Sequence, residues 1–524
     1  MPRDTSDGPS SGSGRPPREA IVEPGGRVGE LADLDAVLDR LAEQVAAAGV
    51  VADRLGVAEP PPIDLETELV AALARPIGTP PLRDLARGVR TVAIITSDAT
   101  RAVPTARLLD PVVATLVEAG VSPDGIDLVV GTGAHRGAGA DEIAAMLGRR
   151  WSGVLRAGNH DARAADLVAV GRLPDGTPLR LDRRVARADL RIAFGQVEPH
   201  EFAGFTGGRK AILPAVADYD AVIHNHALQR LAAPGARSGV LQGNPIHEEM
   251  VAAARLGRLD FIVNVVLDRR LRPLAVTAGD TEAAHEALAS FVRGYAAPPA
   301  FAAAAPDVIV TGPGDPLDIN LYQSVKALVG IEPLLGARAA ADSPRRPVVL
   351  LLSRCWDGTG SEEMLEPFRA TALAESGIAG ERPARRPTAA GERPAGHASA
   401  AHRADLERHA ARAAARARAV LAELEHSYTI EKDHSYYLAR VGLRGAPIVA
   451  CCPGVAATDL AVLGWCAVPD PAEALRLALA SVVRDTGPGA GESGRVLFVA
   501  RPQRLLLGHG DGQTHATSDH RRTR

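Results

Sequence analysis

The chain has 524 residues, 46% of them hydrophobic, so it is long enough to bury large cores in about two to four domains of ordinary size. Its formal net charge of -4 gives no overall attraction to nucleic acid or acidic membranes, and an aromatic content of 3% leaves little for base stacking. We therefore expect a soluble globular protein that has neither nucleic acid nor a membrane as a partner.

The two ends of the chain differ in composition from the rest. Residues 1–27 are rich in Pro, Gly and Ser, which predicts a disordered N-terminal tail without the apolar stretch of a secretory signal. The polar residues 508–524 predict a flexible C-terminal tail. The four cysteines show no CxxC spacing, which is typical of reduced thiols in a cytoplasmic protein, so we predict that location.

Between the tails, short β-branched runs alternate with helical patterns. The first runs lie at 91–96, 126–132, 190–195 and 261–267. One following helix is predicted in detail, with Asp110 as its cap, Pro111 in its first turn and Gly120 at its end. Strands that alternate with helices in this way are typical of a largely parallel sheet.

A second series of strands begins after a Pro- and Ala-rich linker at 295–306. Its members are 307–315, 347–353, 446–452 and 495–500. We therefore predict an α/β fold of two lobes with largely parallel sheets flanked by helices, and an active site in the cleft between the lobes.

The expected division of the chain follows from these two series. The N-terminal α/β domain is predicted at 28–297 and the C-terminal α/β domain at 298–507. A low-complexity stretch at 377–402 predicts a mobile insertion in the second domain, and the Ala- and Arg-rich segment 403–425 predicts a surface helix.

Ligands of open α/β sheets gather in the loops beyond the carboxyl ends of the strands. In the first such loop, Asp98, Thr100 and Arg101 lie where a strand turns into a helix, and an arginine fork there can bind a carboxylate or phosphate. Ordinary helix capping is the alternative. In the second loop, Gly131 precedes His135, which is either a cleft residue or a structural histidine.

The third loop, EPHEFAGFTGGRK (198–210), combines His200 with two glycines and Lys210. Lysine is rare here, since only Lys210, Lys326 and Lys432 occur among 59 basic residues. An amine can form amide or imine bonds and lose its proton, whereas a guanidinium cannot readily do so. Chance retention is the alternative for any one lysine. The loop is no Walker motif, because Arg209 directly precedes the lysine.

Two further patterns add candidates. The HNH sequence places His224 and His226 two residues apart, and in a helix their rings point apart, so we expect at most one to bind metal. In the second lobe, a helix capped by Asp318 places Gln323 and Lys326 together on one face. That face either meets water or holds a small oxyanion.

Together these residues resemble the nickel-pincer lactate racemase family, also called LarA-like. The resemblance runs from about residue 60 to about residue 500, outside the low-complexity insertion. Its motifs are SDATRAVP (97–104), GTGAHR (131–136), EPHEFAGFTGGRKAILP (198–214), NH (225–226) and YQSVKA (322–327). The ten-residue separation of His200 and Lys210, followed by His226, is its most specific element.

The resemblance implies a role for each matching residue. The implied cofactor is a nickel-pincer nucleotide, Ni(II) pyridinium-3,5-bisthiocarboxylic acid mononucleotide, attached covalently to Lys210. The nickel ligand from the protein is His226, and sulfur donors suit this metal. The remaining implied roles are cofactor binding by Asp98, Ala99, Thr100 and Arg101, acid/base catalysis by His135 and His200, and substrate binding by Arg101, Gln323 and Lys326.

The implied reaction inverts the α-carbon of a 2-hydroxy acid such as lactate by proton-coupled hydride transfer. It also implies maturation enzymes as partners, namely a carboxylase/hydrolase, a sulfur transferase and a nickel insertase. Two other hypotheses stay open from the residues alone: a histidine-metal-dependent hydrolase and a non-catalytic small-anion binding protein. Arg209 and the insertion depart from the family pattern, and Lys432 receives no role.

Overall fold

The computed structural model describes residues 31, 33–98, 101–298, 306–337, 346–378, 395–482 and 494–507. The predicted tails at 1–27 and 508–524 lie outside the described residues, as do most of the predicted linker and most of the predicted insertion. In the part of the chain that the structure describes, no helix is long and apolar enough to cross a lipid bilayer.

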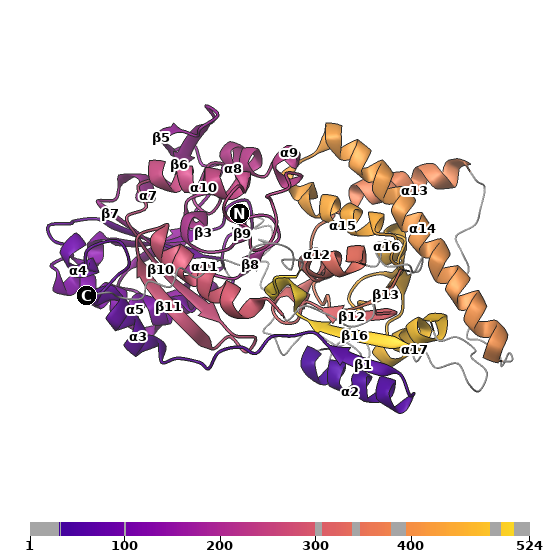
Figure 1. The fold of residues 1–524 in the computed structure, drawn as a ribbon. Helices are drawn as coiled ribbons and strands as arrows, with labels where there is room; N and C mark the ends of the chain where they lie inside the picture. The colour runs from indigo at the N-terminus through magenta and orange to yellow at the C-terminus, as the bar shows by residue number, and fades with distance from the viewer. Residues whose placement is uncertain are drawn as a thin grey trace, which may run out of the picture.

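Two six-stranded sheets form the frame of the molecule, and Figure 1 shows them side by side with helices around each. The N-terminal sheet has the order β11-β10-β7-β2-β3-β4, and only the β10/β11 pair is antiparallel. Its strands are β2 (Val92–Ser97), β3 (Ile126–Gly131), β4 (Arg156–Asn159), β7 (Leu190–Gln196), β10 (Phe261–Leu267) and β11 (Pro273–Gly279).

The C-terminal sheet has the order β1-β16-β12-β13-β14-β15 and is parallel throughout. Its strands are β1 (Val51–Arg54), β12 (Val308–Gly312), β13 (Val348–Leu352), β14 (Ile448–Cys451), β15 (Cys466–Ala467) and β16 (Arg495–Ala500). Strands β7, β10, β12 and β13 are buried along their whole length, as expected for parallel sheets covered on both faces. The predicted α/β fold with largely parallel sheets is confirmed.

Helices surround each sheet. We call the N-terminal sheet and its helices the N-terminal lobe; these helices are α3 (Leu65–Ala74), α4 (Leu82–Leu85), α5 (Thr105–Glu118), α6 (Ala140–Trp151), α7 (Arg183–Arg187), α8 (Tyr219–Asn225), α9 (Leu228–Leu231), α10 (Pro245–Leu256) and α11 (Ala283–Ala296). The C-terminal lobe carries α2 (Leu34–Ala47), α12 (Leu321–Ala337), α13 (Glu366–Ile378), α14 (Ala395–Ser427), α15 (Asp433–Leu443), α16 (Ala457–Val462) and α17 (Pro471–Val482). A hairpin of β5 (Val168–Arg172) and β6 (Pro178–Leu181) extends the N-terminal lobe.

The two lobes share one apolar core. A single cluster of buried side chains includes Phe202 and Ile262 of the N-terminal lobe and Leu321 and Tyr437 of the C-terminal lobe. Burial of apolar surface is the main favourable term in folding and association, so this cluster fixes the lobes against each other. The loops that follow β7 and the helix α12 meet at this contact.

The first elements of the chain do not belong to the lobe that the sequence predicted for them. Strand β1 pairs with β16, and α2 packs its apolar residues Leu34 and Val37 into the cluster beneath the C-terminal sheet. Figure 1 shows both elements, in indigo, beside β16 at the lower right. The range 28–297 therefore needs correction at its start, because strand pairing between distant segments leaves no local signal.

Two predicted helix starts are also wrong. Helix α5 begins at Thr105, so Asp110 and Pro111 lie inside it, because Leu108 and Leu109 already belong to its buried stripe. Asp110 instead accepts hydrogen bonds from α6. Helix α12 begins at Leu321, where the Asn320 side chain accepts from the Gln323 backbone at 3.0 Å. Asp318, the predicted cap, is paired with an arginine instead.

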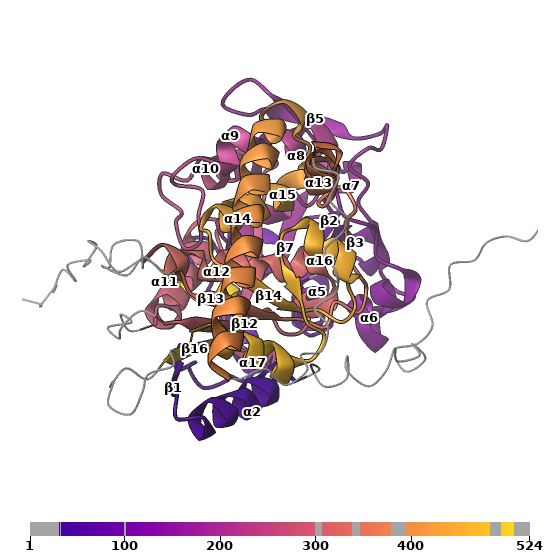
Figure 2. The ribbon, with the colours of Figure 1, turned by 90° about the vertical axis from the view of Figure 1, so that its right-hand side faces the viewer.

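The predicted helix at 403–425 lies inside the longer α14, which Figure 2 shows running along the outside of the C-terminal lobe. One side of this helix, including Leu406, Ala417 and Leu424, is buried. The opposite side is exposed, so this segment is an amphipathic helix on the surface of the lobe, as predicted. It begins at Ala395, so the last residues of the predicted insertion at 377–402 are helical, as expected for alanine-rich sequence.

Candidate active site

The loops that follow β2, β3 and β7 of the N-terminal sheet carry most of the predicted site residues, His226 directly follows α8, and α12 of the C-terminal lobe supplies the rest. Parallel strands end at one edge of a sheet, so residues far apart in the chain come together there. Arg101 and the neighbouring Asp98 follow β2. Ala99 and Thr100, also predicted to bind the cofactor, lie outside the described residues.

His135 lies in the loop after β3, which is joined to the segment that follows Lys210. The Gly133 backbone donates to the Ala215 carbonyl at 3.0 Å, and a Cβ on Gly131 would approach the Ala215 Cβ to 2.6 Å. Glycine at 131 is therefore required by this close approach. The His135 ring is 48% exposed, and its Nδ1 lies 3.0 Å from Oδ2 of Asp98.

His200 lies in a small hairpin of β8 (Pro199–His200) and β9 (Gly204–Phe205) that follows β7. Its ring is buried and contacts the edge of Phe202 at a centroid distance of 4.5 Å. Its Nδ1 is 3.4 Å from both the Glu201 carboxylate and the Ala203 backbone nitrogen. Burial, and next the charge of Lys210, hold the pKa of His200 well below its usual range, so the ring is neutral at pH 7.

Lys210 lies in a short 3-10 helix (Gly208–Ala211) that follows Gly207, a residue with φ of 80°. Its Nζ is 5.5 Å from the centre of the Phe202 ring. Burial, and next the positive charges of Arg101 and Arg209, hold the pKa of Lys210 well below its usual range. The deprotonated amine is the nucleophilic form, so the site favours covalent chemistry at this residue.

The neighbour of Lys210, Arg209, points the other way and ties the loop together. Its guanidinium donates to the carbonyls of Ala203, Phe205 and Gly207 at 2.7, 2.8 and 3.3 Å, and its Nη1 is 2.7 Å from Nε2 of His285. Burial lowers the pKa of Arg209 to about 9, which leaves it charged at neutral pH. The arginine thus holds the backbone that carries Lys210.

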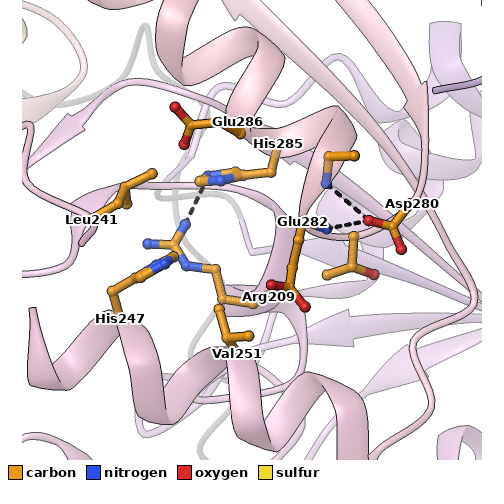
Figure 3. A pocket seen from close by; sticks show the side chains of 10 residues that line it. Arg209, Leu241, His247, Val251, Asp280, Glu282, His285 and Glu286 are labelled. Carbon is orange, nitrogen blue, oxygen red and sulfur yellow. Dashed lines mark hydrogen bonds between the residues drawn. The ribbon is translucent and has the colours of Figure 1, made fainter. Parts of the chain in front are cut away.

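Arg209 also lines a cavity of about 580 Å³. Figure 3 shows its guanidinium beside His285, with His247 and Glu286 also at the cavity. None of the predicted catalytic or substrate-binding residues lines this space. The cavity therefore belongs to the support of the loop rather than to the predicted site.

His226 directly follows α8 and is buried. Its Nδ1 lies 3.0 Å from the Val222 carbonyl, which requires the proton on Nδ1 and leaves the Nε2 lone pair for a ligand. Burial, and next the charge of Lys210, lower the pKa of His226 to about 4. From the C-terminal lobe, the Tyr428 hydroxyl donates to the His226 carbonyl at 2.8 Å.

His224, the other histidine of the HNH sequence, faces a different group of residues. With Asp175 and Glu249 it forms the one cluster of possible metal donors found among the described residues. The Arg230 guanidinium contacts all three members at 2.8 to 3.0 Å. A cation already fills the centre of this cluster, so it is an ion-pair network. The rings of His224 and His226 point apart, as predicted.

The C-terminal lobe presents Gln323 and Lys326 on α12. Lys326 is buried, with its Nζ 3.8 Å from Oε1 of Glu201, and the Oε1 of Gln323 is buried without a hydrogen-bond partner in the described part of the chain. Burial lowers the pKa of Lys326, and Glu201 opposes that effect. The face of α12 that carries them therefore meets the N-terminal lobe rather than water.

Four residues near the site were missed by the sequence analysis. Glu201 is the first. The others form a buried network in which Asp433 accepts from the Tyr322 hydroxyl at 3.1 Å and contacts His434 at 2.6 Å. The charge of Asp433 raises the pKa of His226, against the effect of burial, so this network lies near the predicted metal ligand. Lys432, which precedes Asp433 in the sequence, contacts Ser427 and Glu366 instead.

The structure thus brings the predicted residues into one electrostatic neighbourhood. The charges of Lys210, Arg101 and Lys326 all act on the pKa of His200, and Lys210 and His135 both act on that of His226. The geometry agrees for three of these residues, because the centre of the Phe202 ring lies 4.5 Å from that of His200, 5.1 Å from that of His226 and 5.5 Å from Nζ of Lys210.

Comparison with known proteins shows which family the chain belongs to. Residues 46–239 match the family described as "Lactate racemase N-terminal domain". A lactate racemase of Thermoanaerobacterium thermosaccharolyticum is 37% identical over 300 residues, which cover 57% of this chain and 68% of that protein. The chain belongs to the lactate racemase family. It is an isomerase of the racemase type.

Further relatives agree with this assignment. A lactate racemase of Lactiplantibacillus plantarum is 36% identical over 297 residues, covering 56% of this chain and 66% of that protein. The lactate racemase apoprotein structure from T. thermosaccharolyticum aligns with a TM-score of 0.67 and 26% identity, over 87% of this chain and 94% of that one. A Thermotoga maritima structure with 14% identity and a TM-score of 0.54 shares the fold, over 86% and 99% of the two chains.

Proposed function

We propose that this protein inverts the α-carbon of a 2-hydroxy acid, lactate or a close relative, with a nickel-pincer nucleotide attached to Lys210. The observation that carries the proposal is the partly buried lysine whose amine lies 5.5 Å from the centre of the Phe202 ring, which also contacts the rings of His200 and His226. A surface lysine would retain its ordinary pKa and would not need such surroundings. The relatives named lactate racemase support the same reaction class.

The residues fit the proposed cofactor in three respects. The lowered pKa of Lys210 favours the amine form that a thioamide bond requires. His226 is neutral near pH 7 and holds its Nδ1 proton on Val222, which directs Nε2 to a metal. The cation Arg101 suits an anionic nucleotide. When bound, the nickel-pincer nucleotide would supply an electrophilic carbon as the acceptor for the hydride of the α-carbon.

His135 and His200 carry out the proton transfers of the reaction. One imidazole takes the hydroxyl proton of the substrate at its ring nitrogen, which yields a planar 2-keto acid once the hydride has left. The other imidazole returns a proton to the oxygen when the hydride returns to the opposite face of the α-carbon. A neutral ring is required for the first role, and the lowered pKa of His200 keeps it neutral near pH 7. His135 contacts Asp98 through Nδ1, which leaves Nε2 for the substrate.

Substrate binding falls to Arg101, Gln323 and Lys326. An ammonium and a guanidinium can together hold the carboxylate, while Gln323, whose Oε1 is buried without a hydrogen-bond partner among the described residues, can donate from its amide nitrogen to a substrate oxygen. A planar keto acid that stays ion-paired in this way is retained until the hydride returns. The buried position of Lys326 excludes water from this end of the site.

The proposal also includes the domain boundaries, the maturation partners and the location of the protein. We assign the N-terminal domain to 28–297 apart from α2 and β1, and the C-terminal domain to 298–507. Cofactor loading requires a carboxylase/hydrolase, a sulfur transferase and a nickel insertase. The four cysteines are buried and form no disulfide among the described residues, which supports a reducing, cytoplasmic location. Family membership disfavours both the hydrolase and the anion-binding hypotheses.

The test is racemisation by the loaded protein. The chain is co-expressed with the three maturation activities, incubated with single enantiomers of lactate and related 2-hydroxy acids, and followed by chiral chromatography. We expect one acid to approach an equal mixture from either enantiomer. Equal loss of activity on nickel omission and in Lys210→Ala is expected; racemisation by a nickel-free protein would contradict the proposal.

A further inference from the structure

Glu201 is a buried carboxylate between two of the proposed functional residues. Its Oε2 lies 3.4 Å from Nδ1 of His200, and its Oε1 lies 3.8 Å from Nζ of Lys326. Its side chain is 11% exposed, and that of Lys326 is 9% exposed. A buried carboxylate persists only where it is paired, so these contacts explain its presence.

The Glu201 contacts join the two lobes. His200 and Glu201 belong to the loop after β7, whereas Lys326 belongs to α12 of the C-terminal lobe. The next residue, Phe202, stacks on Tyr437 of the C-terminal lobe with a centroid distance of 6.2 Å and an angle of 8°. The loop is therefore fixed on the partner lobe at Glu201 and at Phe202.

Lys326 needs this partner. Burial alone would favour its neutral amine, and the charge of Glu201 is the first influence that opposes it. The other charged groups that act on Lys326 are Arg101, which disfavours its charge, and Glu198 and Asp433, which favour it. Of these four, Glu201 is the one that contacts the ammonium directly among the described residues.

We propose that Glu201 is a positioning residue that keeps Lys326 charged and aimed at the substrate carboxylate while it orients the His200 ring. The inference rests on the proposed function, because it assigns Glu201 a part in binding the 2-hydroxy acid. Neutral Glu201→Gln keeps the shape of the side chain and removes the charge. Its matched control is Glu198→Gln, the same change in the same loop, where Glu198 contacts Gln196 and Arg504.

The first measurement needs no cofactor. The chain has only Lys210, Lys326 and Lys432, so a protein labelled with 13C- and 15N-lysine gives three side-chain signals that single lysine substitutions assign. We expect the titration midpoint of Lys326 in the unloaded protein to fall by about one pH unit in Glu201→Gln and much less in Glu198→Gln. Glu201→Asp keeps the charge and should restore most of the midpoint. A Lys326 midpoint that stays unchanged in folded Glu201→Gln would overturn the inference.

The second measurement uses the loaded enzyme across pH 6 to 9. KM in Glu201→Gln should rise about tenfold at the alkaline end, because Lys326 there loses the charge that binds the substrate carboxylate. This penalty should shrink toward pH 6, where Lys326 regains its proton, and kcat should change less. A KM increase equal at every pH indicates a purely structural role and overturns the inference. If the wild type fails to racemise, the proposed function fails, and the lysine titration still decides the role of Glu201.

Discussion

The loops that carry His135 and His200 place the same side chain in opposite surroundings. Each ring faces a carboxylate through Nδ1, Asp98 in one case and Glu201 in the other. The His135 side chain is 48% exposed, however, whereas that of His200 is 5% exposed. The residue type therefore does not set the chemistry; the packing of the loop does.

The difference arises from the residues that follow each histidine. After His135 the chain continues to Arg136, which forms an exposed ion pair with Glu142. After His200 it continues to Phe202 and Phe205, which are buried in the core. Apolar anchors draw one loop inward, and a charged pair leaves the other in water. The His135 ring is therefore open to solvent, whereas the His200 ring is not.

Replacing either histidine is the strongest test of whether both loops serve the reaction. General acid/base groups contribute about 100- to 10,000-fold, so His135→Gln and His200→Gln should each lower kcat by that order. His224→Gln, which changes a histidine of the ion-pair network, should leave kcat within about threefold. Full activity in one of the first two variants would show that only one of the loops carries proton transfer.

The arginines that support the two loops should contribute differently to the free energy of unfolding. Arg209→Leu removes a buried guanidinium and leaves three carbonyls without their donor, which should cost about 3 kcal/mol. Arg136→Leu removes an exposed ion pair and should cost less than about 1 kcal/mol. Urea denaturation of the two variants measures both values. Equal costs would mean that the inner loop does not depend on Arg209.

The pH dependence of stability tests the surroundings of the buried His200 ring. The folded pKa of His200 lies below that of an unfolded histidine near 6.5, so the unfolded state binds the proton first and stability falls as pH drops below that value. The slope contributed by His200 reaches about 1.4 kcal/mol per pH unit. His200→Gln should flatten it, as thermal melts at pH 4.5 to 7 would show. A slope unchanged by His200→Gln would mean that the ring is not held neutral.

The smallest expected effect comes from the partner of the exposed histidine. Asp98→Asn keeps the size of the side chain but removes the charge that orients His135. A residue that orients a functional histidine in this way contributes about tenfold to activity. The loss should appear in kcat with KM changed less, because the His135 ring is no longer held by Asp98 at 3.0 Å. A tenfold loss that appears in cofactor loading and not in kcat of the loaded enzyme would assign Asp98 to cofactor binding alone.

Much of the fold could be predicted because its signals are local. The β-branched runs at 91–96 and 190–195 coincide with β2 and β7, since buried parallel strands leave continuous apolar stretches. The pairing of β1 with β16 could not be predicted, because it joins opposite ends of the chain. Helix starts depended on packing that a cap residue alone does not reveal.

The candidate site divides in the same way. Rarity and loop position drew attention to Lys210 and the histidines, which the structure brings into one neighbourhood. Glu201 gave no signal, because a carboxylate in a loop is ordinary until α12 delivers Lys326 to it. Asp433 was missed for the same reason, since its contact with Tyr322 exists only after α12 and α15 have packed.

The central claim is that the Lys210 amine anchors the cofactor, and peptide mass mapping of protein matured with nickel tests it most directly. The account predicts that the peptide containing Lys210 carries the mass of the thioamide-linked nucleotide in protein that racemises, and that Lys210→Ala carries none. Fully active protein with an unmodified Lys210 would contradict it.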